Sequence, residues 1–219
     1  MKLLKSPFII YIAALLVIFA ANRLPMTRPY LGVIAAIVFL YIPIIYMFLE
    51  KKTPGFYGIR KEGLWKSVTR ALAAVSIIFP LYCAGFFLSM KYIYHMSMRF
   101  PGTAFLYEPQ TLLFVLNLLL MVAIPEEVFY RGFIESKLRE GDRRGIRLFG
   151  VRAGASFFIV NVLFAAGHLV VLPDAARLAV FFPGLVMSWL REKDDNIAGS
   201  VVFHWLSDVL SFLLFSMLR

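Results

Sequence analysis

The chain has 219 residues, of which 61% are hydrophobic, and its mean hydropathy is +0.79. Soluble domains are about 45–50% apolar, so this composition excludes a soluble globular domain and a disordered chain. The net charge of +10 is carried by segments between long apolar runs, where topology and anionic lipid explain it better than nucleic acid does. We expect a multi-pass membrane protein with no nucleic-acid partner.

Seven apolar segments reach or approach the roughly 20 residues that cross a hydrocarbon core. Pro and Gly punctuate the joins between them, and no internal repeat is visible. The sequence therefore predicts one integral-membrane domain, 1-219, with an all-α fold: a polytopic transmembrane helical bundle. The predicted spans are 7–22, 31–49, 68–90, 111–135, 153–172, 175–190 and 197–218.

The Lys and Arg residues predict the orientation. With a cytoplasmic N-terminus, the inner segments hold sixteen of them, including Lys2 and Lys5, and the outer segments hold six, including Arg99 and Arg219. Inner loops of membrane proteins carry such an excess, so we predict a cell (inner) membrane protein with its N-terminus in the cytoplasm and its C-terminus outside. Span 175–190 is short, and a re-entrant path there would return the C-terminus to the cytoplasm.

Away from the span ends, charged residues and histidines within the predicted spans are confined to the fourth, fifth and seventh. They are Glu126, Glu127, Arg131, His168, His204 and Asp208, with Asn161 as a weaker polar companion. A charge near the bilayer centre costs roughly 2.5–3.5 kcal/mol on insertion scales. We therefore expect these three spans to enclose a polar active-site cavity that the other helices shield.

Helical spacing sharpens this prediction. Glu127 and Arg131 are four residues apart and can form an ion pair, whereas Glu126 lies on another face of the helix. His204 and Asp208 have the same four-residue spacing, so the carboxylate can orient the imidazole.

Three further features concern the geometry of the predicted helices. Pro125 removes a backbone hydrogen bond and allows a local kink, and Gly167 permits another helix to come close. For Glu126 and His168 to reach one depth, the fourth helix must continue past residue 135 or the fifth must begin after residue 153. We favour the first, since helix-forming residues follow 135.

A carboxylate and a histidine can hold and deprotonate a water, and a second histidine can donate to a carbonyl oxygen that becomes negative during hydrolysis. The chain has no GxSxG or HExxH motif, and its one cysteine, Cys83, is remote from the polar residues. Two alternatives stay open at this point. Zinc could bind Glu126, His168 and His204, or the Glu127–Arg131 pair could simply fix helix packing.

Three motifs carry a resemblance to a known family. "EEVFYR" (Glu126–Arg131), "FAAGH" (Phe164–His168) and "HWLSD" (His204–Asp208) resemble the EExxxR, FxxxH and HxxxN/D motifs of the CPBP family. That family includes Rce1-like CAAX prenyl endopeptidases, bacteriocin-processing and self-immunity proteins, and myxosortase-like enzymes that process C-terminal signals. The resemblance covers a core over 111-218 and leaves the N-terminal helices, 1-110, without a match.

The resemblance implies a glutamic-type intramembrane protease without a cofactor. Glu126 would be the base, His168 would help to activate water, and His204 with residue 208 would form the oxyanion site. Glu127, Arg131 and Asn161 would support them. Position 208 is Asp, where the best-known CAAX members carry Asn, and an ionised Asp cannot donate a hydrogen bond to an oxyanion.

The implied substrate is a membrane-anchored or C-terminal-signal protein or peptide, cleaved near its C-terminus. The competing interpretations are a zinc-dependent membrane protease, a non-catalytic immunity factor or scaffold, and a proton-coupled transporter. The absence of inverted repeats speaks against the transporter.

Overall fold

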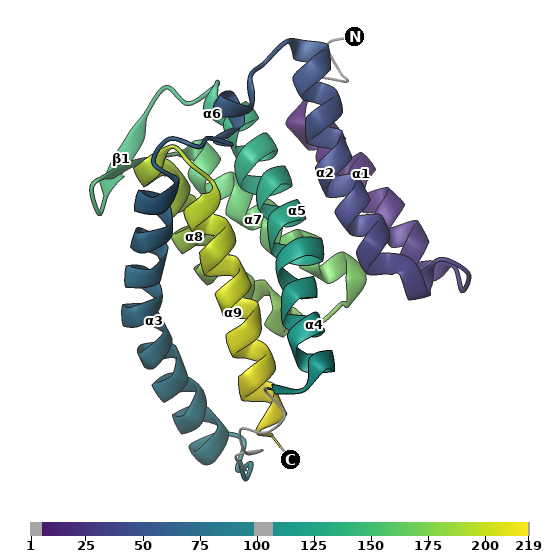
Figure 1. The fold of residues 1–219 in the computed structure, drawn as a ribbon, viewed down its shortest axis with the longest axis vertical. Helices are drawn as coiled ribbons and strands as arrows, with labels where there is room; N and C mark the ends of the chain where they lie inside the picture. Colours follow the sequence, from purple (N-terminus) through teal and green to yellow (C-terminus); the bar gives the residue numbers. More distant parts are fainter. Residues whose placement is uncertain (1–5, 99–106, 219) are drawn as a thin grey trace.

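The computed structural model describes residues 6–98 and 107–218 (Figure 1). Most of these residues are helical. The first half contains α1 (Pro7–Arg23), α2 (Leu31–Glu50) and α3 (Leu64–Tyr92), with 3-10 turns at Arg28–Tyr30 and Pro54–Tyr57. The second half contains α4 (Pro109–Asn117), α5 (Ile124–Glu127), α6 (Glu135–Arg139), α7 (Ala155–Val171), a 3-10 segment (Ala175–Val180), α8 (Phe181–Asp194) and α9 (Ala198–Ser216).

Four helical stretches are long and apolar enough to cross a membrane: Arg28–Glu50, Leu64–Tyr92, Pro109–Arg139 and Ala198–Ser216. Pro7–Arg23 and Ala155–Val171 are apolar but shorter. The predicted span 175–190 is divided between a 3-10 segment and α8, which ends in charged residues. The prediction of a helical bundle with several membrane spans is confirmed at this level.

The fourth predicted helix continues to Arg139, as favoured from the sequence. Two π-helical stretches, Leu118–Ala123 and Val128–Ile134, interrupt its α-helical hydrogen bonding. The first ends two residues before Pro125, whose ring and missing N–H are incompatible with a regular α-helical turn. The expected irregularity at Pro125 is therefore accompanied by a widened turn, a feature often found at functional sites.

The fold is all-α as predicted, with a short β-hairpin added to the helices. Strands β1 (Gly145–Leu148) and β2 (Val151–Gly154) pair antiparallel, with Gly145 opposite Gly154. The two turn residues, Phe149 and Gly150, both have positive φ, as a tight two-residue hairpin turn requires. Trp189 Nε1 donates to the Phe149 carbonyl at 3.2 Å, which fastens the hairpin to α8.

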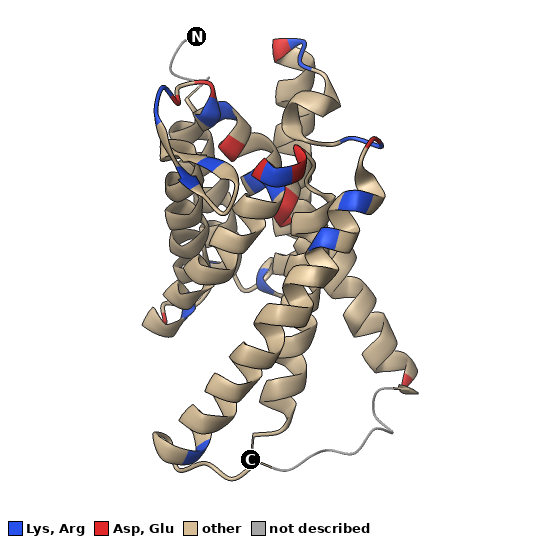
Figure 2. Ribbon diagram, turned by 90° about the vertical axis from the view of Figure 1, so that its left-hand side faces the viewer, with Lys and Arg blue, Asp and Glu red and all other residues tan. Residues whose placement is uncertain are grey.

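Aromatic side chains dominate the core between α2 and the α5–α6 region, where Phe39 packs on Phe129 and Tyr46 on Phe133. The Tyr11 hydroxyl ties α1 to α7 by donating to the Leu163 carbonyl at 2.7 Å. Lys and Arg residues gather toward the end of the bundle where the described chain begins (Figure 2). The C-terminal end of α9 lies at the opposite end (Figure 1). Lys2, Lys5, Arg99 and Arg219, used in the orientation prediction, lie outside the described residues.

Candidate active site

His204 on α9 is the centre of the polar cluster. Its Nδ1 lies 2.9 Å from Glu127 Oε1, and its Nε2 lies 4.0 Å from Glu126 Oε2 and 3.5 Å from Asp208 Oδ2. The His204 side chain is 5% exposed. The structure therefore brings three of the predicted carboxylates around one ring, two of them from the helix that carries Pro125.

Glu127 makes two contacts through one oxygen. Its Oε1 faces His204 and also lies 3.3 Å from Nη1 of Arg131. Glu127 and Arg131 have no exposed surface, so this is a fully buried ion pair with the predicted spacing. The cross-helix contact to His204 was not predicted, because the rotation of α9 against α5 depends on packing and not on spacing within either helix.

Arg131 is held on its far side by three groups. Its Nη2 donates to Asn161 Oδ1 at 2.9 Å and to the Gly184 carbonyl at 3.3 Å, and its guanidinium lies 4.3 Å from the centre of the Phe164 ring. Asn161 thus lies in direct contact with Arg131. Gly184 belongs to α8, so the predicted sixth segment also contributes to the polar cluster, in addition to the three spans expected.

Two residues that sequence reasoning missed extend this cluster. Asn161 Nδ2 donates to Ser188 Oγ at 3.0 Å, and Ser188 Oγ donates to Glu135 Oε2 at 3.0 Å. Glu135 stands at the end of a predicted span, where a carboxylate is expected to be solvated, yet it is 1% exposed. Its spacing of four residues from Arg131 was the one sequence signal available. We call Glu127, Arg131, Asn161, Ser188 and Glu135 the buried chain.

His168 on α7 is placed differently. Its Nδ1 lies 2.9 Å from the Phe164 carbonyl, which can only accept, so Nδ1 carries the proton and Nε2 is left as an acceptor. The Phe164 ring lies between the two imidazoles, with centroid distances of 4.6 Å to His168 and 5.7 Å to His204. Among the described residues, His168 makes no ion pair or hydrogen bond with Glu126.

Glycine allows the close approach beside His168, as expected. A Cβ at Gly167 would lie 2.5 Å from the Tyr130 hydroxyl, so a larger residue would separate α7 from the Pro125 helix.

Glu126 and Asp208 have oxygens that lack a hydrogen-bond partner: Glu126 Oε2 and Asp208 Oδ2. Their side chains are 19% and 30% exposed, unlike the fully enclosed Glu127. We call Glu126, His168 and Asp208 the open groups. Each offers an oxygen or nitrogen acceptor that makes no hydrogen bond to a described residue, although both oxygens face His204 Nε2. A free acceptor of this kind is what a water or substrate site needs.

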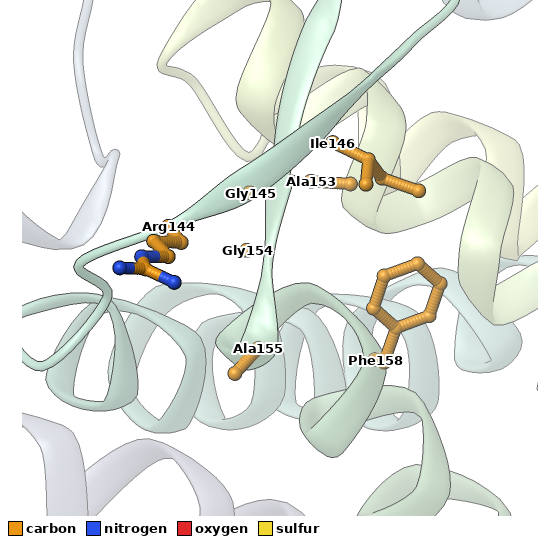
Figure 3. A pocket seen from close by; sticks show the side chains of 7 residues that line it. All are labelled: Arg144, Gly145, Ile146, Ala153, Gly154, Ala155 and Phe158. Atoms are coloured by element: carbon orange, nitrogen blue, oxygen red, sulfur yellow. The ribbon is translucent and has the colours of Figure 1, made fainter.

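Over residues 6–98 and 107–218, no group of three or more His, Cys, Asp or Glu side chains has an arrangement that could hold a metal ion. The zinc alternative through Glu126, His168 and His204 therefore rests on the sequence alone. One pocket, of about 330 Å³, lies away from His204 between the β-hairpin and the start of α7 (Figure 3).

Comparison with known families addresses the second half of the chain. Residues 108–210 match the family described as type II CAAX prenyl endopeptidase, Rce1-like. This segment is an Rce1-like protease domain. It contains all of the open groups, His204 and the buried chain, and it excludes α1, α2 and α3. The predictions of CPBP membership and of a hydrolase of the protease type are confirmed. No curated protein and no solved structure matches the chain.

Proposed function

We propose that this chain is an intramembrane endopeptidase in which Glu126 is the general base. The observation that carries the proposal is the contrast between two neighbouring glutamates. Glu127 is enclosed and bonded through Oε1 to Arg131 and His204, whereas Glu126 is partly exposed, makes no hydrogen bond to a described residue, and has its Oε2 4.0 Å from His204 Nε2. A carboxylate with a free oxygen beside an imidazole can accept a proton from water.

His168 would share the activation of water. Because Nδ1 is bonded to the Phe164 carbonyl, the second nitrogen is an acceptor that can hold a water O–H. His168 comes from α7 and Glu126 from α5, so a water held by both would be positioned by two separate helices.

His204 would stabilise the oxyanion. The contact with Glu127 places a proton on Nδ1, so donation from Nε2 as well requires a doubly protonated, positively charged ring. Glu126, Glu127 and Asp208 surround the ring with negative charge. This gives Asp208 a role that needs no donated hydrogen bond: it contributes to the charge that favours an imidazolium.

The proposed reaction is a hydrolysis. Glu126 takes a proton from water as the water oxygen bonds to the carbonyl carbon, and His204 donates to the resulting oxyanion. The C–N bond then breaks, the nitrogen receives the proton from Glu126, and a carboxylic acid and an amine leave.

The membrane arrangement belongs to the same proposal. We infer that the chain crosses the inner membrane seven times and that its N-terminus lies in the cytoplasm. The active-site cavity would lie among the Pro125 helix, α7 and α9. A membrane-anchored substrate, cleaved near its C-terminus, fits an active site built at membrane depth.

The test is cleavage of a C-terminal-signal substrate by the wild type and by Glu126→Gln. We expect kcat to fall about 1,000-fold or more, since the base is removed. Glu140→Gln is the matched control, because Glu140 is an exposed partner of Lys52 at the charged end. Cleavage by Glu126→Gln at the wild-type rate would overturn the assignment.

The same assay separates the alternatives. Loss of wild-type cleavage with a chelator, restored by zinc, would indicate a zinc-dependent protease. An immunity factor or scaffold would show no cleavage by any variant while retaining its binding function in Glu126→Gln.

A further inference from the structure

The buried chain leads away from the candidate active site toward the charged end of the bundle. It ends in Ser188 on α8 and Glu135 on α6, two residues that the proposed reaction does not use. We propose that Ser188 and Glu135 are positioning residues that set the orientation of the Asn161 amide and, through Arg131 and Glu127, of the His204 imidazole. This inference rests on the proposed function for its effect on catalysis.

The Asn161 amide has a right and a wrong orientation. Its nitrogen donates to the Phe157 carbonyl at 2.7 Å and to Ser188 Oγ at 3.0 Å, and its oxygen accepts from Arg131 at 2.9 Å. A flipped amide would point N–H groups at the guanidinium, which is donor-only. Arg131 therefore has this partner only while the amide keeps its observed orientation.

Ser188 supports that orientation together with the Phe157 carbonyl, and Glu135 determines which way the serine hydroxyl points. A hydroxyl has one proton, and this one donates to Glu135 Oε2. Its lone pairs consequently face Asn161, where they can accept from Nδ2 but not donate to Oδ1. Without the carboxylate, the hydroxyl could turn and favour the flipped amide.

The orientation of the Asn161 amide affects His204 through successive contacts between buried side chains. Arg131 has Asn161 on one side and Glu127 Oε1 on the other, and the same Oε1 faces His204 Nδ1. From Glu127 to Glu135 every member of the chain is at most 1% exposed, so water cannot easily replace a lost partner. Buried polar networks of this kind are strongly coupled.

Glu135 is costly to keep for packing alone. A buried carboxylate is unfavourable unless its oxygens are satisfied, and Glu135 Oε1 has no hydrogen-bond partner. The charges of the buried Arg131 and Arg191 favour a carboxylate here, but neither guanidinium donates a hydrogen bond to it. A role in fixing the polarity of the Ser188 hydroxyl explains why a carboxylate stands there.

The first test compares two buried serines in the full-length protein. Ser188→Ala removes the acceptor for Asn161 and the donor for Glu135. Ser200→Ala is the matched control. Ser200 is equally buried, and its hydroxyl donates to the Met187 carbonyl, which is not part of the buried chain. We expect Ser188→Ala to lower kcat about tenfold with KM within about twofold, because misorientation of a catalytic group affects the chemical step. Ser200→Ala should retain the wild-type kcat.

A second readout needs no substrate. The chain has three histidines, so nitrogen NMR of a histidine-labelled sample contains three imidazoles, and the one missing from His204→Gln is assigned to His204. We expect the His204 nitrogen signals to shift in Ser188→Ala and to stay at their wild-type positions in Ser200→Ala. Unshifted His204 signals in Ser188→Ala, or equal shifts in both variants, would overturn the inference.

Glu135→Gln provides an independent variant if Ser188→Ala does not fold. The amide of Gln can donate as well as accept, so the hydroxyl loses its fixed direction while the volume is kept. The same His204 signals should shift, and unchanged signals would overturn the inference. If Glu126→Gln cleaves normally, the proposed function fails, whereas the NMR result still decides whether the buried chain controls His204.

Discussion

The buried chain and the open groups lie next to each other but differ in exposure and in hydrogen bonding. Every member of the buried chain is enclosed and hydrogen-bonded to another member. Glu126 and Asp208, among the open groups, keep an oxygen without a partner and remain partly exposed. The difference teaches that full enclosure with hydrogen bonds to other side chains marks the supporting residues of this bundle, whereas partial exposure without such bonds marks the residues available for chemistry.

Matched substitutions of the adjacent glutamates give the largest expected effect on stability. Glu127→Gln leaves Arg131 as a buried charge without its counter-charge, so we expect the free energy of unfolding to fall by about 3–5 kcal/mol. Glu126→Gln should change it by less than about 1 kcal/mol, because no ion pair with Arg131 is broken. Denaturant unfolding in detergent micelles, followed by circular dichroism, measures both. Equal losses of unfolding free energy in the two variants would remove the distinction between the buried chain and the open groups.

Gly184→Ala tests how tightly α8 must approach the chain. A Cβ there would lie 2.4 Å from Asn161 Oδ1 and 3.1 Å from Arg131 Nη2. We expect a destabilisation of about 1–3 kcal/mol from overpacking, measured by the same unfolding experiment. Gly85→Ala on α3 is the control, because nothing lies within 4 Å of its added Cβ; helix propensity there should raise stability by roughly 0.5–1 kcal/mol. A neutral Gly184→Ala would show that α8 can move away freely.

Asp208→Asn addresses the open groups. It removes one of three carboxylates around His204 and supplies a donor in its place. We expect kcat to fall by about three- to tenfold, because the charges of Glu126 and Glu127 remain beside the ring. Steady-state cleavage rates measure this. An unchanged or higher rate would show that the charge of Asp208 is dispensable, and a loss as large as that of Glu126→Gln would make Asp208 part of the water-activating pair.

Asp195 belongs neither to the buried chain nor to the open groups, and its substitution should have the smallest effect on stability. Burial opposes its ionisation, but the hydrogen bond from Arg191 and the charges of Arg191, Arg60 and Arg139 prevail and hold the pKa of Asp195 below its usual value. Such a group stabilises the fold above its unfolded-state pKa and loses that contribution as pH falls. Because the side chain is 43% exposed, Asp195→Asn should cost about 1 kcal/mol or less at pH 7.

Thermal unfolding of Asp195→Asn and wild type, compared at pH 7 and at pH 3, checks this expectation. The difference between the two proteins should shrink at the lower pH, where the wild-type carboxyl takes up a proton. A difference that grows toward low pH would contradict the sign.

The sequence predicted what helical geometry fixes locally. The Glu127–Arg131 spacing, the close approach at Gly167 and the continuation of the helix to Arg139 all follow from residues on one helix, and the structure has all three. Ionisable residues in apolar segments also identified the part of the chain that matches the protease family.

Contacts between helices could not be predicted from the sequence. The partner of His204 Nδ1 depends on how α9 is rotated against α5, and Ser188 is an ordinary residue until α8 packs beside Asn161. The β-hairpin was missed for a different reason: its strands are four residues each, too short for alternation to stand out from a polar loop.

The order of the residues along the chain has a consequence for biosynthesis. The helix Pro109–Arg139 emerges from the ribosome before α7, α8 and α9, which supply the partners of Arg131, Glu127 and Glu135. During that interval the nascent helix must enter the bilayer with its acidic and basic residues unmatched by any neighbour. The Glu127–Arg131 pair is the exception, because both charges belong to the same helix. These two charges can cancel as soon as one turn has formed, and later helices then assemble around a span in which Glu126 is the acidic residue at its centre still without a partner.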